Sequence, residues 1–284
     1  MQKQFNNSTF FNSTISYFCT VKLLEHITKP VTAELAQFEA FFVQTLKADT
    51  EPMDTIMQYV CQAKGKRLRP LLVLLSAKLF GEVNEQTLRA ASFVEMVHTA
   101  TLIHDDVVDD SDQRRGHDSV KAHFGNLSAV LAGDYLLAKA MLLLSNLKDI
   151  DILNEMLGTT AAMSEGELMQ NIVADCVPQS EKTTQYLDII TRKTALLMRS
   201  CCVAGAMSVK ATPKQIQHIA DFGINFGILF QLRDDMIDGE NTAEAQALLP
   251  EYQQKTLEAL KPFPASETLN ALRDLTVFCG ERTE

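Results

Sequence analysis

Apolar residues recur at intervals of three and four along almost the whole chain, and the alternation typical of strands is hard to find. This spacing gathers apolar side chains on one face of a helix. It predicts long helices over residues 71–80, 88–108, 129–147, 152–173, 186–209 and 216–237. With 284 residues, 46% of them hydrophobic, the chain can bury a sizeable core. The sequence therefore predicts an all-α protein.

Local signals mark where helices begin and end. Thr212, Pro213 and Gln215 predict a capped helix start with proline at the first helical position. Pro178 separates two of the long helices. No Gly/Ser-rich linker, low-complexity tract or internal repeat divides the chain. We therefore expect a single domain over residues 26–284, preceded by a flexible extension over residues 1–25.

Charge and cysteine content disfavour several classes of protein. The formal net charge is −10, whereas nucleic-acid-binding proteins usually carry a basic field, so we expect no nucleic-acid partner. The six cysteines show no zinc-like spacing and are typical of core thiols in a reducing compartment. We expect no apolar run of the roughly 20 residues that span a bilayer, and no signal peptide. These points predict a cytoplasmic protein without a transmembrane segment.

Two clusters of aspartates with the spacing Asp-Asp-x-x-Asp lie at the ends of predicted helices. The first aspartate motif consists of Asp105, Asp106 and Asp109, and the second of Asp234, Asp235 and Asp238. Residues three or four apart share a helix face, where like charges destabilise the helix. Two opposed sets of carboxylates suit a hard divalent cation such as Mg²⁺, which is usually shared between carboxylates and substrate phosphates. The sequence therefore predicts a magnesium site that binds a phosphate-bearing substrate.

Basic residues supply a complementary set of phosphate ligands. The segment AKGKRLRP places Gly65, Lys66 and Arg69 just before a predicted helix, and Arg114 and Arg115 close the first aspartate stretch. An arginine can donate two parallel hydrogen bonds to phosphate oxygens, and a lysine offers a compact positive charge. In an acidic chain with a predicted metal site, these residues indicate a second, basic pocket for phosphate.

Together these motifs resemble the trans-type isoprenyl diphosphate synthases, the polyprenyl synthetase family. The segments GKRLRP, HTATLIHDDVVDDSDQRRG, GDYLLAKA, RKTA, FGILFQLRDD and DDMID occur in the family's order over about residues 30–238. The resemblance implies an all-α bundle around a deep central cavity. It also implies a Mg²⁺-dependent prenyltransferase, which joins an allylic diphosphate such as farnesyl diphosphate to isopentenyl diphosphate. The reaction proceeds by ionisation, condensation and elimination of a proton.

The resemblance assigns roles to individual residues. The first aspartate motif is implied to hold two Mg²⁺ ions and the second motif a third. The residues implied to contact the allylic diphosphate are Arg114, Lys193 and Gln231, and Thr194 is also implied to bind substrate. The residues implied to hold isopentenyl diphosphate are Gly65, Lys66, Arg69, His98 and Arg115. The residues implied to be catalytic are Asp105, Asp106, Asp109, Lys193 and Asp234.

Product length is implied by the residues one turn before the first aspartate motif, which project into the cavity that receives the growing tail. Here they are Ala100 and Thr101, both small, whereas family members with short products tend to carry bulky aromatic residues. We therefore expect a long-chain product of the octaprenyl type, with Phe93, Met96 or residues 135–144 as the floor. The resemblance further implies a homodimer and is compatible with product release at a membrane surface.

After Asp238 the sequence departs from the family pattern. The family continues through Gly-Lys and Gly-Lys-x-Thr elements, but this chain reads GENTAEAQALLPEYQQKTLEAL and passes almost at once into its final helices. The C-terminal region is shortened, and the usual lysine over the allylic diphosphate is missing. This departure keeps an alternative open, in which the chain is a catalytically weak or non-catalytic subunit of a two-component polyprenyl diphosphate synthase.

Two other enzyme classes fit the sequence less well. Class I terpene cyclases line their cavity with aromatic residues, whereas this chain has no Trp, only 7% aromatic residues and a second Asp-Asp-x-x-Asp motif. A metal phosphohydrolase of the His-Asp type needs further histidine ligands, and His98, His117 and His123 are not suitably spaced.

Overall fold

The computed structural model describes residues 23–62, 65–114, 116–146, 149–173 and 182–282. Most of the expected N-terminal extension, Arg115 and Pro178 lie outside these ranges. The elements of the N-terminal half are η1 (Lys29–Val31), α2 (Thr32–Leu46), α3 (Glu51–Gln62), α4 (Leu68–Phe80), α5 (Glu85–Val108), β1 (Gln113–Arg114), β2 (His117–Asp118), α6 (Val120–Phe124) and α7 (Asn126–Ser145). Those of the C-terminal half are α8 (Ile150–Val173), α9 (Lys182–Ile190), η3 (Thr191–Ala195), α10 (Leu196–Ser208), α11 (Pro213–Asp238), α12 (Thr242–Ala259) and α13 (Glu267–Glu281).

The six predicted helices are all present, and each begins slightly earlier than predicted. At the start of α11, Thr212 and Gln215 form the expected capping box. The main difference lies in the segment 186–209, which was predicted as one helix. It is divided by η3, a single π-helical turn that joins α9 to α10. A π turn adds one residue to a helix that continues on both sides, so the whole segment still has a helical pattern in the sequence.

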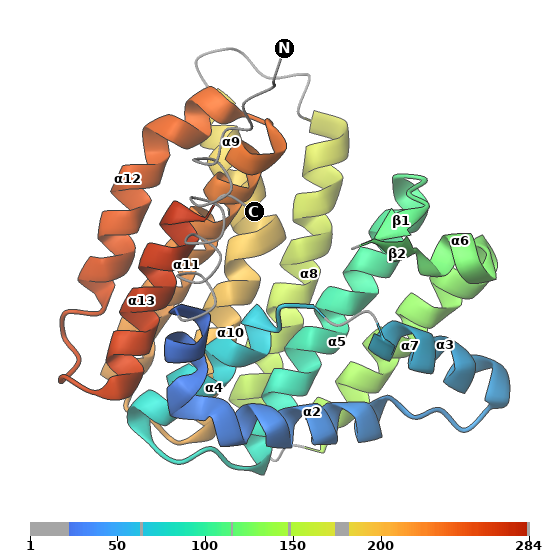
Figure 1. Cartoon of the computed structure of the whole chain (residues 1–284), viewed down its shortest axis with the longest axis horizontal. Helices are drawn as coiled ribbons and strands as arrows, with labels where there is room; N and C mark the ends of the chain where they lie inside the picture. Colours follow the sequence, from blue (N-terminus) through green and yellow to red (C-terminus); the bar gives the residue numbers. More distant parts are fainter. Residues whose placement is uncertain (1–22, 63–64, 115, 147–148, 174–181, 283–284) are drawn as a thin grey trace, which may run out of the picture.

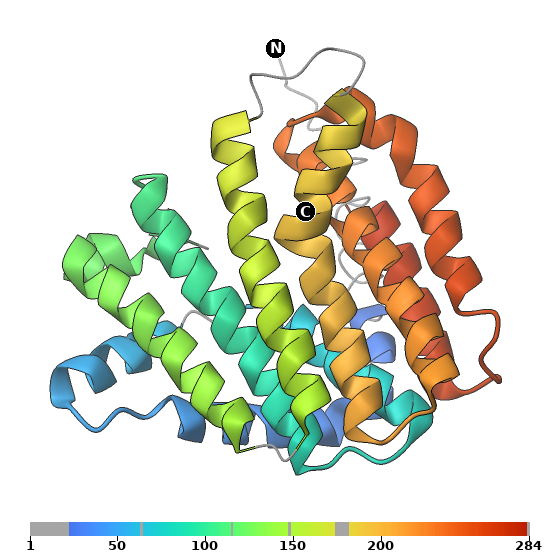
Figure 2. The same cartoon turned by 180° about the vertical axis from the view of Figure 1, so that it is seen from behind.

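The long helices lie side by side and form a bundle, which is the predicted fold class (Figures 1 and 2). Helices α5, α8 and α11 run in the same direction, so their C-terminal ends reach the same end of the bundle, drawn at the top in both views. Helix α2 crosses the bundle near its opposite end (Figure 1). The only strands among the described residues are β1 and β2, a short antiparallel hairpin in which Gln113 pairs with Asp118. This topology brings both aspartate motifs to one end of the molecule.

Buried apolar side chains form one main core and a smaller cluster beside the second aspartate motif. In the main core, Phe93 of α5 and the stacked Phe222 and Phe226 of α11 are almost fully buried. Burial of each such side chain contributes roughly 1.5–3 kcal/mol to folding. The smaller cluster contains Ile190, Ala195, Ile228, Leu232 and Ala245. It joins η3 to α11 directly below the second motif.

Helix α7 is long and apolar enough to cross a membrane, with a mean hydropathy of 1.7, and it is the one such helix among the described residues. The expectation that no stretch reaches this length is therefore wrong for α7. One side of α7 packs on α5, where a Cβ added at Gly133 would lie 2.2 Å from Nε2 of His104. Core helices of soluble proteins have the same length and composition, so a single such helix is weak evidence for a membrane span.

Candidate active site

The first aspartate motif lies at the C-terminal end of α5, where Asp105 faces α8 and η3. The pKa of Asp105 is raised from 3.8 to about 6, mainly by burial and also by the carboxylates of Glu167 and Asp109. The cations of Lys193 and Arg114 oppose this effect. Asp105 is therefore a half-buried carboxylate in a locally acidic environment, and an additional cation at this position would be stabilising.

Asp106 occupies a different environment from Asp105. Its side chain is almost fully buried, and one carboxylate oxygen accepts hydrogen bonds from Nε and Nη2 of Arg114 at 2.9 and 2.5 Å. Asp106 thereby fixes Arg114, which the hairpin β1–β2 presents to the end of α5. Asp109 is exposed and forms the C-cap of α5, with its backbone N–H donating to the carbonyl of Asp105.

The two remaining aspartates of this segment serve the hairpin and α6. Lys121 of α6 lies 2.6 Å from a carboxylate oxygen of Asp110 and 3.0 Å from one of Asp112. Only three of the five aspartates therefore belong to the site, and the other two neutralise a single lysine. Their pairing accounts for part of the charge that is crowded into residues 105–112.

The second aspartate motif ends α11. Asp234 forms an ion pair of 2.5 Å with Arg282, which follows α13, and the guanidinium of Arg282 also stacks on Phe230. Burial nevertheless raises the pKa of Asp234, and the neighbouring Asp238 and Asp235 add to the effect. Asp238 is exposed at the last turn of the helix. The C-terminal part of the chain thus supplies a cation to the second motif.

Asp235 is buried, and both of its carboxylate oxygens accept hydrogen bonds. The hydroxyl of Tyr186 donates to Oδ2 at 2.5 Å, and the side-chain amide of Gln231 donates to Oδ1 at 2.7 Å. The carbonyl oxygen of Gln231 in turn accepts from the hydroxyl of Thr194 at 2.7 Å. Gln231 and Thr194, both expected to bind substrate, are therefore bonded to each other.

Lys193 lies on η3 between the two motifs. Its ammonium group is 2.8 Å from a carboxylate oxygen of Glu167 and donates to Gln170 at 2.9 Å. The positive charge of Lys193 also lowers the pKa of Asp105, and the next residue, Thr194, is bonded to Gln231. The turn η3 therefore connects the first motif to the second. The structure thus brings Asp105, Lys193 and the second motif to one region, as the sequence predicts.

The basic loop before α4 contains a half-buried anchor, Arg67, that was not among the predicted site residues. Arg67 adopts a left-handed conformation with φ of 52° and forms ion pairs with Glu39 and Glu95, at 2.8 and 2.6 Å. Its guanidinium also lies over the ring of Phe42, 5.0 Å from the centroid. These contacts fix the loop, while the neighbouring Lys66 is exposed.

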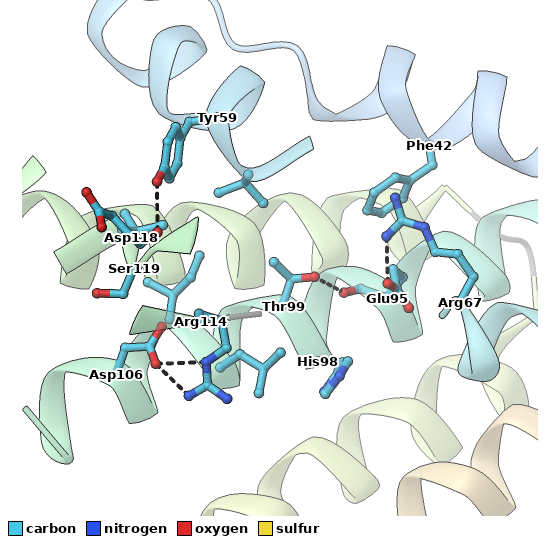
Figure 3. A pocket seen from close by; sticks show the side chains of 14 residues that line it. Phe42, Tyr59, Arg67, Glu95, His98, Thr99, Asp106, Arg114, Asp118 and Ser119 are labelled. Atoms are coloured by element: carbon cyan, nitrogen blue, oxygen red, sulfur yellow. Dashed lines mark hydrogen bonds and ion pairs between the residues drawn. The ribbon is translucent and has the colours of Figure 1, made fainter. Parts of the chain in front are cut away.

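A pocket of about 70 Å³ lies beside the first motif, between α5, the N-terminal helices and the β1–β2 hairpin. It brings His98 together with Asp106 and Arg114 at one end and with the Arg67–Glu95 pair at the other (Figure 3). His98 and Arg114 were predicted to bind substrate. Gly65, Lys66 and Arg69 do not line this pocket, and Arg115 lies outside the described residues.

The small residues before the first motif lie on different faces of α5. Ala100 is fully buried and stands one turn before His104, which contacts α7. Thr101 is half-buried and stands one turn before Asp105, and its hydroxyl donates to the carbonyl of His98. Phe93 and Met96 are buried in the main core. The side chain nearest the Asp105 face is therefore that of Thr101.

Several residues of this site were missed in the sequence. Glu167, Gln170, Tyr186 and Arg282 contact predicted site residues but stand in no recognisable motif. Tyr186 lies two helical turns before Lys193, and this spacing was the one sequence feature that could have indicated a role for Tyr186 in the site. Arg282 follows Asp234 by 48 residues, and no local pattern connects the two.

Comparison with known proteins identifies the class. Residues 50–247 match the family described as Polyprenyl synthetase. An octaprenyl diphosphate synthase from Haemophilus influenzae is 33% identical over 239 residues, which cover 80% of this chain and 72% of that protein. A farnesyl diphosphate synthase from Bacillus subtilis is 36% identical over 236 residues, which cover 77% of this chain and 79% of that protein.

A solved structure shows the same fold. The crystal structure of a polyprenyl synthase from Caulobacter crescentus, complexed with calcium and isoprenyl diphosphate, matches with a TM-score of 0.83 and 26% identity. The match covers 92% of this chain and 98% of that one. The protein therefore has the helical fold of the isoprenoid synthases. It belongs to the polyprenyl synthetase family, and its relatives place it among the prenyltransferases.

Proposed function

We propose that this protein is a Mg²⁺-dependent prenyltransferase, which condenses an allylic diphosphate with isopentenyl diphosphate units to give a long-chain trans-polyprenyl diphosphate. One observation carries the proposal. Asp105, Lys193 and the second aspartate motif meet at one end of the bundle, linked through Thr194 and Gln231. This arrangement provides oxygen ligands for metal ions and a lysine for the same polyanion.

The donor set of the two motifs fits hard divalent cations. All of its side-chain ligands are carboxylates, and the locally acidic environment of Asp105 favours an added cation. Within the described residues, no group of three or more His, Cys, Asp or Glu side chains can hold a metal ion on its own. We propose that diphosphate oxygens complete the coordination, since Mg²⁺ is usually shared between carboxylates and substrate phosphates. We propose that three Mg²⁺ ions bind with the substrate, two at the first motif and one at the second.

The chain's own cations then act on the substrates. Bound Mg²⁺ supplies positive charge that stabilises the departing diphosphate. Lys193 and Arg114 donate hydrogen bonds to the allylic diphosphate and lower the barrier to ionisation of its C–O bond. Lys66, Arg69 and Arg115 hold isopentenyl diphosphate, whose double bond attacks the allylic carbocation. The proton lost in the final step passes to the released diphosphate.

Product length rests on local residues, because relatives with both short and long products resemble this chain about equally. The small side chain of Thr101 leaves room for a long tail on the Asp105 face, and the family resemblance implies the same role for Ala100, which lies on the side of α5 that contacts α7. We expect Ala100→Phe to shorten the main product, as measured by chromatography of the dephosphorylated alcohols. Ala100 is fully buried, so the thermal unfolding of the variant must be checked, since overpacking costs about 1–3 kcal/mol. A folded variant with an unchanged product would contradict the placement.

We also propose that the protein is a homodimer, joined through the exposed side of α7. That side carries large apolar residues, namely Leu127, Val130, Leu131, Met141 and Leu142. An apolar stripe of this kind is typical of an interface. Light scattering coupled to gel filtration is expected to give twice the mass of one chain, and Leu131→Glu is expected to shift the protein towards the monomer.

The activity itself has a direct test. Purified protein is incubated with farnesyl diphosphate, radiolabelled isopentenyl diphosphate and Mg²⁺, with EDTA in a parallel sample, and the extracted products are sized. We expect a metal-dependent, labelled long-chain product. If folded protein incorporates no label, the alternative subunit role gains support, and the assay is repeated with candidate partner subunits.

A further inference from the structure

The π turn η3 is held tightly between two helices. A Cβ added at Gly166 of α8 would lie 2.7 Å from the backbone nitrogen of Lys193. A Cβ added at Gly227 of α11 would lie 2.5 Å from the Cα of Ala195. Both distances are shorter than real Cβ contacts, so only glycine allows η3 to pack this closely on each side. π-Helical turns occur frequently at functional sites. Here the turn fixes the backbone that carries Lys193.

A chain of hydrogen bonds connects η3 to α11 and to α9. Thr194 donates to Gln231, Gln231 donates to Asp235, and Tyr186 donates to the second oxygen of Asp235. Each link is between 2.5 and 2.7 Å long. An ionised carboxylate only accepts hydrogen bonds, so Asp235 orients both of its donors. The chain begins on α9 and ends on the residue next to Lys193.

The three aspartates of the second motif differ in what they can still bind. Asp235 is only 6% exposed, and its two oxygens are occupied by Tyr186 and Gln231. Asp238 is exposed, and Asp234 remains partly accessible beside Arg282. Identical spacing in the sequence therefore does not give identical roles.

We propose that Tyr186 is a positioning residue for the second aspartate motif. It holds Asp235, together with Gln231, as a hydrogen-bonded anchor rather than a metal ligand, and the same chain of bonds fixes the turn that carries Lys193. Metal binding at this motif is left to Asp234 and Asp238. The inference rests on the proposed function, because it concerns the metal site of that reaction.

The chemistry of Tyr186 supports this role. A tyrosine hydroxyl is protonated at neutral pH, and that of Tyr186 donates a hydrogen bond to Oδ2 of Asp235 at 2.5 Å. Phenylalanine keeps the ring in place and removes this donor alone, so Tyr186→Phe isolates the hydrogen bond.

The test compares Tyr186→Phe, Asp235→Asn and Asp234→Asn with the matched control Tyr252→Phe. Tyr252 is also a half-buried tyrosine near the second motif, but its ring packs against Lys255 and the apolar clusters. For each variant we would measure kcat, KM for the allylic diphosphate and the Mg²⁺ concentration that gives half-maximal rate. Calorimetric titration with Mg²⁺ and inorganic pyrophosphate supplies a readout that needs no turnover.

The anchor role predicts a distinct pattern. Tyr186→Phe and Asp235→Asn are expected to lower kcat about tenfold, with the half-saturating Mg²⁺ concentration within about twofold of the wild type. Asp234→Asn is expected to raise that concentration about tenfold, as loss of a ligand does. Tyr252→Phe is expected to match the wild type. The inference would be overturned if Asp235→Asn raised the half-saturating Mg²⁺ concentration as much as Asp234→Asn does. It would also be overturned if Tyr186→Phe behaved like Tyr252→Phe.

A double-mutant cycle tests whether Tyr186 acts through Asp235. We expect Tyr186→Phe combined with Asp235→Asn to be no slower than Asp235→Asn alone, and strictly additive losses would show that the two residues act separately. The titration with pyrophosphate separates this inference from the proposed function. If the wild type has no prenyltransferase activity, the proposed function fails, whereas the metal-binding comparison between Asp235→Asn and Asp234→Asn still decides the role of Asp235.

Discussion

The two aspartate motifs share a spacing but balance their charges differently. In the first motif, Asp105 faces Glu167 as well as Lys193, and its pKa is raised to about 6. In the second motif, Asp234 is paired directly with Arg282 at 2.5 Å. The first aspartate of the first motif therefore lies in a locally acidic environment, whereas the first aspartate of the second motif is already paired directly with a protein cation. We infer that a metal ion joins the first motif more readily than the second.

The middle members of the two motifs show what the motifs have in common. Asp106 and Asp235 are both buried, and both are hydrogen-bonded by protein donors. Asp106 is bound by the cation of Arg114, while Asp235 is bound by the neutral donors Tyr186 and Gln231. The second aspartate of each motif thus fixes local structure. Both carboxylate oxygens of Asp235 are occupied, whereas Arg114 binds only one oxygen of Asp106.

The largest effect is expected from Asp105→Asn, which removes the carboxylate with the least compensated charge. We expect kcat/KM to fall about thousandfold, since electrostatic groups that act on the transition state have effects of this size. Asp110→Asn is a matched control, because Asp110 pairs with Lys121. The kcat/KM of Asp110→Asn is expected to stay within about threefold of the wild-type value. A similar loss of kcat/KM in both variants would show that Asp105 and Asp110 do not differ in role.

Next in size is the effect of Arg114→Met on stability. Asp106 is almost fully buried, so loss of Arg114 leaves a buried carboxylate without its cation. Because Arg114 itself is partly exposed, we expect the free energy of unfolding to fall by about 2–4 kcal/mol, slightly less than for a fully buried pair. Urea denaturation monitored by circular dichroism measures this free energy. A smaller loss of stability in Arg114→Met than in Arg282→Met would contradict the expected order of the two motifs.

Arg282→Met is expected to lower stability less than Arg114→Met does. It is also expected to strengthen metal binding at the second motif. Asp234 is more exposed than Asp106, so we expect a loss of about 1–2 kcal/mol. The freed carboxylate should bind Mg²⁺ more tightly, and the half-saturating Mg²⁺ concentration should fall about threefold. An increase in this concentration would show that Arg282 orients Asp234 for the metal instead of competing with it.

The smallest effect concerns the pH dependence of stability without metal. The pKa of Asp105 is 3.8 in an unperturbed side chain and about 6 here, so the folded protein holds a proton that the unfolded chain has lost between these values. Its free energy of unfolding should therefore fall as pH rises from about 4 to about 6. After discounting for solvent screening, we expect a contribution of about 1–2 kcal/mol.

Two controls isolate this contribution. Asp105→Asn should lack it, and Mg²⁺ with pyrophosphate should abolish it, because ligation favours the ionised carboxylate. Thermal unfolding at several pH values measures the slope, and identical slopes for wild type and variant would contradict the assignment. The neighbouring Glu167, Lys193, Asp109 and Arg114 are unchanged in this comparison.

Much of the fold could be predicted from the sequence, because the signals for a helix lie within the helix itself and at its ends. The apolar spacing and the Thr212 cap place six helices near their observed bounds. The interruption at η3 could not be predicted, because it depends on the close approach of Gly166 and Gly227 from other helices. The apolar character of α7 over its full length was also underestimated, since scattered polar residues divide an otherwise apolar helix.

The candidate site was predictable where its residues stand in motifs. Both aspartate sets, Lys193, Thr194 and Gln231 come together as expected. The sequence does not reveal which aspartates are already bonded, because their partners lie far along the chain. Tyr186 precedes Asp235 by 49 residues, and Arg282 follows Asp234 by 48. These partners are set by helix packing, which spacing alone does not encode.

The central claim is that the carboxylates and the substrate diphosphate hold the metal ions jointly. Counting bound Mn²⁺ by electron paramagnetic resonance, with and without a non-hydrolysable allylic diphosphate analogue, tests it most directly. We expect weak binding of Mn²⁺ to the protein alone, three tightly bound ions with the analogue, and two with the analogue in Asp234→Asn. Three tightly bound ions without any diphosphate, or no gain when the analogue is added, would contradict it.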